Sequence, residues 1–426
     1  MQKSKYCIVI SYDAFSKDNW AFAKEQPNLA KLIATGASTT NVKSVYPTLT
    51  YVIHSAYVTG AYPNNHGVYH NNPLQPFISE NDQNWHWFRR DIKLPTIYEA
   101  AKEAGLTTAG ILWPVTGKAK IDYNIPEIKA VKNENQALKV LKNGSKWYTL
   151  QMEMKYGKIR RGIEQPYLDD FITACTVETI KTKRPNLLLM HLIDLDDSKH
   201  LQGTKGKHID EVIMRMDRRI GEIVQAVEDA GIASETTIMI VGDHGQLDVQ
   251  YKIYLNRLLY ENGLIYEVDG KWQWRAYVQG AGGAAYLHVQ EGDVEAEKLA
   301  LALLDDALQN QNIGIEAIYG REQLDVLHVD ERFNYMIEAK VGYAFEDDHK
   351  SEIIVDLHAQ GKVYATHGYS PDKPDYTSNL IVSGAQIKKG VDIGTVEVVD
   401  IGPTIAHVLG IDFKAKDGRA LTEIFE

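Results

Sequence analysis

The sequence predicts an α/β protein with a mostly parallel central sheet, helices on both faces and a small α+β cap insertion. Three short apolar runs, residues 6–11, 186–192 and 236–241, have the length and composition of buried parallel strands. Carboxylates closely follow each of these runs. Segments with helical periodicity separate the runs, and alternation of strand and helix is typical of a parallel sheet.

Helices are expected between these strands. Residues 28–36 resemble a short helix ended by Gly36, and residues 95–105 carry a capping box and a terminal glycine. From Ile209 to Val227 apolar residues recur at three- and four-residue steps, which predicts one long helix. A further strand is expected over residues 107–113.

The pattern changes in two other parts of the chain. Residues 116–165 are lysine-rich and show no strong period, so we expect a surface excursion there. Aromatic-rich short runs, a glycine cluster and a helical segment between residues 247 and 364 predict the cap insertion. The core is therefore expected to comprise residues 1–246 and 365–426, the latter with a strand over 379–384 and a terminal helix over 400–410.

Composition limits the classes of function. The chain has 426 residues, 44% of them hydrophobic, and a net charge of −11, which argues against a long nucleic acid as partner. The N-terminal apolar run ends at Asp13, too early for a membrane span or signal segment, so we expect a cytoplasmic protein with no membrane partner. Cys7 and Cys175 lie in apolar segments, as buried thiols do in a reducing compartment. The oligomeric state stays open.

A stretch around Thr50 is the strongest candidate for a reactive group. The turn Tyr46-Pro-Thr-Leu-Thr50 precedes a short apolar helical segment, which puts the Thr50 hydroxyl at the positive end of a helix dipole, a natural seat for a phosphate. A hydroxyl becomes a good nucleophile when a neighbouring metal ion lowers its pKa. The alternative is that Thr50 only caps its helix. A polar turn over residues 66–71 could bring the Asn71 amide over the same site.

Metal ligands are predicted at strand ends and in nearby loops. Carboxylate and imidazole groups without thiolates are the ligand set of catalytic zinc or a similar divalent ion, and two clusters of them suit a two-metal site. Taken alone, each group is more often part of a turn or an ordinary polar residue than a metal ligand, so their convergence decides. Manganese and iron stay open as alternatives. The candidates are Asp13, Asp196, His200, Asp243, His244 and His367.

The order of these motifs resembles the alkaline phosphatase superfamily, specifically its nucleotide pyrophosphatase/phosphodiesterase (type I phosphodiesterase) branch. The resemblance covers the predicted core and hardly the cap. The motifs that carry it are Tyr46-Pro-Thr-Leu-Thr50, Thr59-Gly-Ala-Tyr-Pro63 with His66-Gly67, Leu112-Trp-Pro114, Asp196-x-x-x-His200-x-x-Gly203, Gly242-Asp-His-Gly245 and Thr366-His-Gly-Tyr369.

The resemblance implies two divalent metal ions, most simply Zn²⁺. One ion would be held by Asp196, His200 and His367. The other would be held by Asp13, Asp243 and His244, with the Thr50 oxygen as a further ligand. The resemblance also implies that Thr50, not Thr48, is the nucleophile and that Asn71 contacts a phosphoryl oxygen.

Two departures from the family's pattern affect the fine shape of the pocket. Val52-Ile53 precede His54 where the family usually has Pro-Asn, and Lys199 precedes His200 where glycine is common. We interpret His54 and His66 as structural, since buried histidines are usually satisfied by hydrogen bonds.

These features support the hypothesis of a two-metal phosphodiester hydrolase with a covalent phospho-threonine intermediate. The motifs bring no arginine, which favours a small diester or nucleotide-like substrate, with Tyr51 either stacking on a base or packing in the core. A phosphonate (phosphonoacetate-type) hydrolase or a phosphomonoesterase of the same superfamily is the nearest alternative. A non-catalytic metal-dependent binding protein is the alternative from another class.

Overall fold

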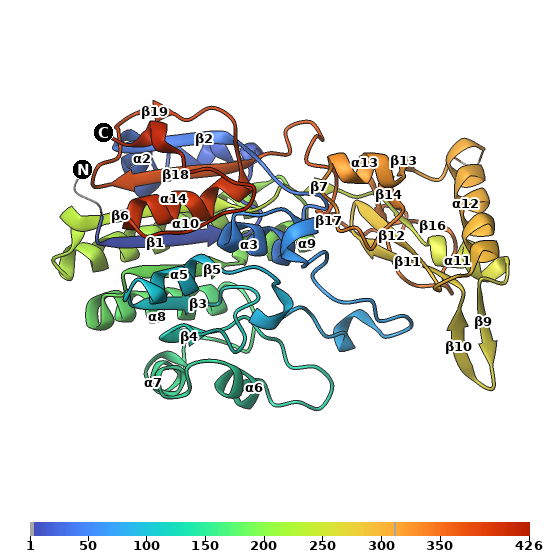
Figure 1. Cartoon of the computed structure of the whole chain (residues 1–426), viewed down its shortest axis with the longest axis horizontal. Coiled ribbons are helices and arrows are strands. Elements are labelled where there is room, and N and C mark those ends of the chain that lie inside the picture. The colour runs from blue at the N-terminus through green and yellow to red at the C-terminus, as the bar shows by residue number, and fades with distance from the viewer. Residues whose placement is uncertain (1–3, 311) are drawn as a thin grey trace.

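A computed structural model describes residues 4–310 and 312–426 and contains one large sheet between layers of helices, next to a second group of smaller sheets (Figure 1). Residues 1–3, where the predicted core begins, lie outside the described residues. The order of the large sheet is β19-β2-β18-β6-β1-β5-β3-β4, with β20 paired to β2. Its strands are β1 (Tyr6–Tyr12), β2 (Gly36–Lys43), β3 (Thr108–Ile111), β4 (Tyr123–Ile125), β5 (Leu187–Leu192), β6 (Thr236–Gly242), β18 (Ser378–Gly384), β19 (Val391–Asp392) and β20 (Val396–Glu397).

The central strands are parallel, so the predicted α/β class is confirmed. β1 pairs in parallel with both β5 and β6, and β3 pairs in parallel with β4 and β5. Among the described strands of this sheet, only β18 is antiparallel to its neighbours, β2 and β6. The carboxyl ends of β1, β5 and β6 therefore meet at one edge of the sheet, where ligands bind in open α/β sheets.

Alternate residues of the central strands face two apolar cores. Cys7 and Val9 of β1 pack with one set of helices, whereas Ile8 and Ile10 pack with the other. This period of two is the side-chain period of a strand buried on both faces. The first set is α3 (Thr50–Thr59), α5 (Ile97–Glu103) and α14 (Ile401–Leu409), and the second is α2 (Pro27–Ala34), α8 (Tyr167–Lys183) and α10 (Lys207–Asp229).

The expectation that Gly36 ends a helix is wrong. α2 ends at Ala34, and Gly36 begins β2. A Cβ atom on Gly36 would lie 2.1 Å from the backbone oxygen of Val382 in β18, so the glycine permits close contact between two strands. β2 itself was not predicted, because its small and polar residues give no β-branched apolar run.

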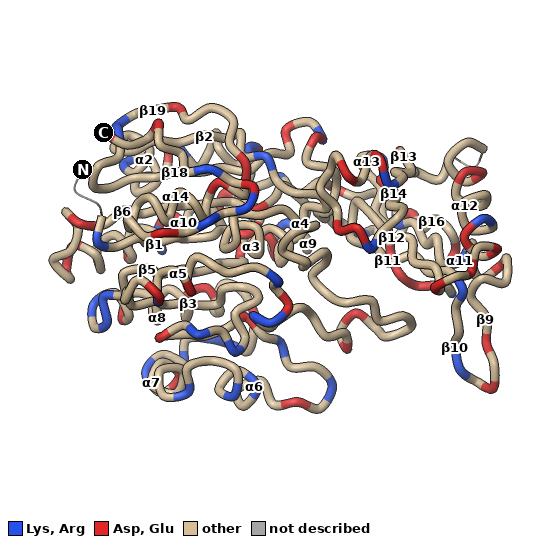
Figure 2. Tube along the Cα trace, viewed as in Figure 1, with Lys and Arg blue, Asp and Glu red and all other residues tan. Residues whose placement is uncertain are grey.

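Residues 116–165 contain more regular structure than expected. β4 lies there, as do two helices, α6 (Gln136–Asn143) and α7 (Lys146–Tyr156). Apolar residues lie on opposite sides of α7, so the sequence shows no single apolar face with a helical period there. Lys and Arg residues gather around α6 and α7, which lie beside the edge strand β4 (Figure 2).

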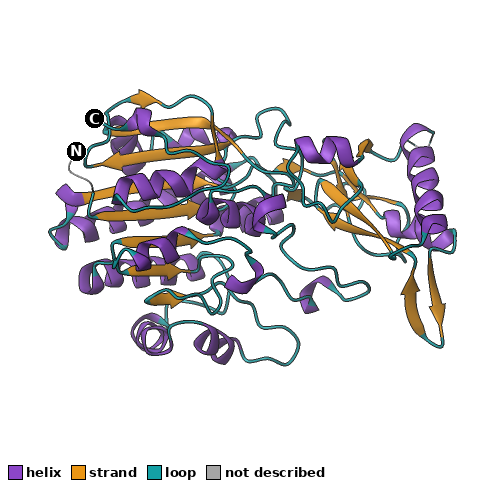
Figure 3. Cartoon of the chain, in the orientation of Figure 1, coloured by secondary structure: helices purple, strands orange, loops and turns teal. Residues whose placement is uncertain are grey.

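The segment predicted as a cap insertion forms smaller sheets with their own apolar core, to the right of the large sheet in Figure 3. The four-stranded sheet is β11 (Ala276–Ala281), β12 (Ala284–Val289), β14 (Met336–Ala339) and β13 (Ile315–Tyr319), accompanied by α11 (Leu255–Glu261) and α12 (Val294–Gln309). The remaining strands are the hairpin β9 (Ile265–Val268) and β10 (Lys271–Trp274), and the sheet of β15 (Tyr343–Phe345), β8 (Tyr251–Ile253) and β16 (Ile354–Asp356).

At the two predicted cap boundaries, β7 (Leu247–Asp248) pairs antiparallel with β17 (Ala365–Thr366). The division into a core and a cap stays a prediction. Within the described ranges, no helix combines the length and apolarity that crossing a bilayer requires.

Candidate active site

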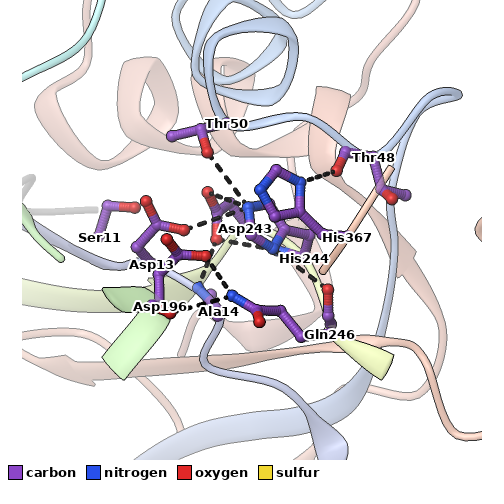
Figure 4. Close-up of polar contacts among 12 residues, drawn as sticks. Ser11, Asp13, Ala14, Thr48, Thr50, Asp196, Asp243, His244, Gln246 and His367 are labelled. Atoms are coloured by element: carbon purple, nitrogen blue, oxygen red, sulfur yellow. Dashed lines mark hydrogen bonds and ion pairs between the residues drawn. The ribbon is translucent and has the colours of Figure 1, made fainter. Parts of the chain in front are cut away.

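The candidate ligands come together at the carboxyl edge of the sheet (Figure 4). Asp13 follows β1, and Asp243 and His244 follow β6. Asp196 and His200 lie one turn apart on α9 (Asp194–Gln202), the helix that follows β5. His367 follows β17, and Thr50 is the first residue of α3. Parallel pairing of β1, β5 and β6 thus brings together side chains from positions 13 to 244, and Thr50 on α3 and His367 after β17 add to them.

The Nε2 atom of His244 is surrounded by three oxygen atoms. Asp13 Oδ1 lies 3.1 Å away, Asp243 Oδ2 lies 3.5 Å away and Thr50 Oγ1 lies 3.2 Å away. All four side chains are buried. The candidate nucleophile and the predicted ligands of one metal ion therefore share one small volume.

The second predicted ligand set also converges. Asp196, His200 and His367 each offer an atom within 4.8 Å of the others, and Asp196 Oδ2 lies 3.3 Å from His200 Nε2. Asp196 forms a similar group with Asp13 and His244. It lies between the two clusters, which the sequence did not show.

Backbone carbonyls orient the three imidazole rings. The Nδ1 atoms of His200, His367 and His244 lie 2.6, 2.9 and 3.2 Å from the carbonyl oxygens of residues 365, 48 and 245. A carbonyl only accepts, so each Nδ1 carries a hydrogen and each Nε2 is left to face the site. This is how histidine ligands are usually held in metal sites.

The buried carboxylates fit a cation. Asp243 Oδ1 accepts hydrogen bonds from the backbone N–H groups of Ala14 (3.0 Å) and His244 (2.9 Å), which turns Oδ2 toward the site. Apart from ion-pair contacts with histidine rings, Asp243 Oδ2 and Asp13 Oδ1 have no hydrogen-bond partner among the residues that the structure describes. Buried carboxylate oxygens are stable only when paired, so this arrangement suits divalent ions.

The pKa shifts in the metal-free site also indicate a place for a cation. Burial and the charge of Asp13 raise the pKa of Asp243 to about 7. Burial opposes the charged form of His244, but Asp243 and Asp13 outweigh it and raise its pKa to about 9. Burial disfavours the anion of Asp13, yet His191 and His244 hold its pKa well below the usual range. Protons thus occupy a place that a cation would take.

Thr50 does not cap its helix. The N-cap residue of α3 is Leu49, and the N–H of Tyr51 donates to Asn71 Oδ1 at 3.0 Å. Asn71 therefore performs the capping role at this helix, and the Thr50 hydroxyl points to His244 instead (Figure 4).

Asn71 lies at the edge of the site. Its oxygen is occupied by Tyr51, and its amide NH₂ group has no hydrogen bond to any residue in the described ranges. Asn71 lines a cleft of about 720 Å³ together with His200 and His367 from one side and Lys252 and Tyr277 from the other. A substrate in this cleft would meet both the amide and the imidazoles.

Tyr51 faces away from this cleft. Its side chain is 1% exposed, its hydroxyl donates to Glu127 Oε1 at 3.2 Å, and its ring meets Trp85 edge to face, with 5.2 Å between centroids. Tyr51 lines a mostly apolar pocket of about 250 Å³. Trp85, which the sequence did not single out, lines both this pocket and the cleft. The role of Tyr51 in base stacking stays a prediction.

Three further residues support the site, and the sequence did not predict this role for any of them. His191 Nε2 lies 3.3 Å from Asp13 Oδ2, and its Nδ1 lies 3.2 Å from Glu127 Oε2. Gln246 donates to both the backbone and the side-chain oxygen of Asp196 (Figure 4). Lys199, the unusual residue before His200, is buried and donates to Ala14 O at 2.8 Å.

The two histidines interpreted as structural are buried. His54 has both ring nitrogens in hydrogen bonds, at 2.8 Å from Ser11 Oγ and 2.7 Å from Thr50 O. Its Nδ1 also lies 3.8 Å from Asp243 Oδ2, and His54, His191 and Asp243 form a third group of possible ligands. His66 Nδ1 accepts from the N–H of Val68 at 3.2 Å.

The chain is similar to a known protein family and to several known proteins. The profile of the family described as type I phosphodiesterase / nucleotide pyrophosphatase matches residues 7–370. Venom phosphodiesterase 2 of Crotalus adamanteus is 24% identical over 252 residues, which are 57% of this chain and 27% of that protein. Human ectonucleotide pyrophosphatase/phosphodiesterase family member 1 is 24% identical over 242 residues, 55% of this chain and 23% of that protein. The aligned region thus spans about a quarter of each of these relatives.

Solved structures share the fold over the whole chain. Human ectonucleotide pyrophosphatase/phosphodiesterase 5 superposes with a TM-score of 0.69 and 18% identity, covering 99% of this chain and 100% of that one. An inactive threonine-to-alanine variant of the murine protein, in complex with AMP, superposes with a TM-score of 0.69 and 16% identity, covering 100% of both chains.

Proposed function

Because the chain belongs to the type I phosphodiesterase / nucleotide pyrophosphatase family, whose members are hydrolytic enzymes, we propose that it hydrolyses small phosphodiester or nucleotide-like substrates with Thr50 as nucleophile. The observation that carries the proposal is the position of Thr50 Oγ1, 3.2 Å from His244 Nε2 and beside two buried carboxylates. A threonine with only a structural role would not need to lie among candidate metal ligands.

Two divalent ions, which we propose to be Zn²⁺, would supply Lewis acidity that lowers the pKa of the Thr50 hydroxyl and stabilises the leaving oxygen. One ion would be held by Asp13, Asp243 and His244, and the other by Asp196, His200 and His367. The donors fit these ions because they are carboxylate oxygens and Nε2 atoms whose rings are fixed by backbone carbonyls.

The reaction has two displacements at phosphorus. In the first, Thr50 Oγ1 loses its proton to solvent and attacks phosphorus, a bond between Oγ1 and phosphorus forms, and the bond to the leaving group breaks. The leaving alcohol or phosphate oxygen takes up a proton from solvent. In the second, water attacks the phospho-threonine and loses a proton to solvent, the bond between Oγ1 and phosphorus breaks, and Thr50 regains a proton. The Asn71 NH₂ group and free N–H groups at the start of α3 would stabilise charge on the non-bridging oxygens.

The surroundings favour a diester over a monoester. None of the described residues that line the cleft is an arginine. Of the two lysines among them, Lys252 pairs with Glu346, and Lys350 Nζ lies 5.4 Å from the centroid of the Trp272 ring. A monoester dianion rewards an additional cation near the phosphate, whereas a diester has a single charge and a second group to accommodate. AMP in the murine relative supports a nucleotide-like group.

The test compares an aryl phosphate diester with the corresponding monoester, using protein whose metal content is measured on the same sample. We expect a higher kcat/KM on the diester. A preference for the monoester would reject the diester proposal, and turnover of phosphonoacetate alone would assign the chain to phosphonate hydrolysis. Thr50→Ala should abolish turnover with metal content unchanged, whereas Thr50→Ser should retain part of it. Absence of turnover in the metal-loaded native protein would favour a binding protein.

A further inference from the structure

Helix α7 has an apolar face that no other part of the described chain covers. Its inner side, with Tyr148 and Met152, is buried. Its outer side has Trp147, Leu150 and Met154, which are 84%, 36% and 76% exposed. Spacings of three and four residues put these side chains on one side of the helix. Such a cluster of large exposed apolar side chains is unusual on a soluble surface and marks an interaction site.

Free positive charges surround this apolar stripe. Lys146 and Lys158 lie near its ends, and α6 adds Leu138 (65% exposed) and Lys142. These three lysines have no ion pair with any residue of the described ranges, whereas Lys155 pairs with Glu178. We call Leu138, Lys142, Lys146, Trp147, Met154 and Lys158 the basic apolar face.

The charge of this region is opposite to that of the whole chain. Residues 129–161 contain nine Lys or Arg and two Glu, although the protein has a net charge of −11. Figure 2 shows the corresponding blue segments on and around α6 and α7. A partner of this face must therefore combine negative charge with an apolar phase that accepts tryptophan and methionine.

We propose that the basic apolar face binds the surface of an anionic lipid bilayer. Tryptophan and leucine side chains enter the boundary between headgroups and acyl chains, while lysines bind the anionic headgroups. A second copy of the same face is disfavoured because two basic surfaces would repel each other. A nucleic acid would pair with the lysines but would provide no apolar phase for the Leu and Met side chains.

The proposal changes the expectation that the protein has no membrane partner. That expectation concerned spanning segments, and α7 with its 11 residues is far too short to span a bilayer. A helix that lies in the plane of the interface needs only one exposed apolar side flanked by basic residues. The proposal does not depend on the proposed hydrolase function.

The experiment measures flotation of the full chain with vesicles of phosphatidylcholine and phosphatidylglycerol in equal parts, and with vesicles of phosphatidylcholine alone. We expect binding to the anionic vesicles only, and weaker binding at high salt because the lysine contribution is screened. Trp147→Ser with Met154→Ser should reduce binding on the order of tenfold, because apolar area no longer enters the bilayer. Lys142→Gln with Lys146→Gln and Lys158→Gln should reduce it similarly.

Matched controls remove equivalent groups elsewhere. Val326→Ser with Val294→Ser removes exposed apolar side chains from the predicted cap, and Lys205→Gln with Lys388→Gln and Lys389→Gln removes exposed lysines. These variants should bind as the native chain does, and all variants should keep the native Tm because the replaced side chains are exposed. Absence of binding to anionic vesicles, equal losses in the control variants, or equally strong binding to poly-glutamate or duplex DNA would overturn the proposal.

Discussion

The ring of His191 lies between Asp13 and Glu127, with Nε2 3.3 Å from Asp13 Oδ2 and Nδ1 3.2 Å from Glu127 Oε2. Tyr51 extends this chain by donating its hydroxyl to the other oxygen of Glu127. A candidate metal ligand is thus joined through one imidazole to Tyr51 and Glu127, which line the apolar pocket. Such outer contacts hold ligands in the geometry that a metal requires.

His191→Leu should therefore weaken metal binding by about 10–100-fold, the usual effect of losing an outer partner of a ligand. The measurement is retention of metal against a graded series of chelator concentrations. The matched control is His288→Asn, which removes a hydrogen-bonded histidine of the predicted cap and should leave retention unchanged. Equal metal retention by His191→Leu and the native chain would show that Asp13 needs no such partner.

The stability of the metal-free protein should fall as pH rises from 6.5 to about 9. Burial opposes the charged form of His244, but Asp243 and Asp13 raise its folded-state pKa from 6.5 to about 9. A group whose pKa is higher in the folded state stabilises fully below its unfolded pKa, and this contribution disappears as pH passes the folded pKa. Tm measured in excess chelator at both pH values tests this, and His244→Asn should show a smaller decrease. An increase in the Tm of the native chain would contradict it.

Metal affinity should change with pH in the opposite direction. A divalent ion at Asp243 and His244 must displace the proton that His244 holds below its pKa of about 9. Affinity for Zn²⁺, measured by competition with a chelator of known proton affinity, should therefore increase between pH 6.5 and 9. A constant affinity over this range would mean that the ion does not bind at His244.

Lys199 should be important for stability. Its side chain is fully buried, and Nζ lies 2.8 Å from Ala14 O, 2.9 Å from Asn19 Oδ1 and 3.4 Å from Asp18 Oδ2. Lys199→Ala removes all three contacts of this buried ammonium group and should lower the free energy of unfolding by about 3 kcal/mol in urea denaturation. Lys207→Ala, at an exposed position on the following helix, is the control and should change it by less than about 0.5 kcal/mol.

Much of the site could be predicted because strand ends and ligand types are local features. Asp13 and Asp243 directly follow apolar runs, and parallel strands bring such positions together. The supporting residues could not be predicted in this way. His191 lies inside an apolar run and reads as strand interior, and Gln246 has no local pattern at all. Their roles depend on contacts with Asp13 and Asp196, far away in the chain.

In the fold, too, some elements follow from a local sequence pattern, whereas others depend on contacts with distant residues. The period of three and four residues in α10 is visible in the sequence because one side of that helix is buried. α7 has apolar residues on a buried side and on an exposed side, so no single face emerges. Gly36 reads as a helix end, although the contact that requires a glycine is with Val382 in another strand.

We propose that two divalent ions bind on either side of Thr50. Anomalous scattering from crystals of the metal-loaded protein would locate these ions. We expect one anomalous peak among Asp13, Asp243, His244 and the Thr50 oxygen, and a second among Asp196, His200 and His367. Peaks elsewhere, or none at these residues in protein that turns over the diester, would contradict this proposal.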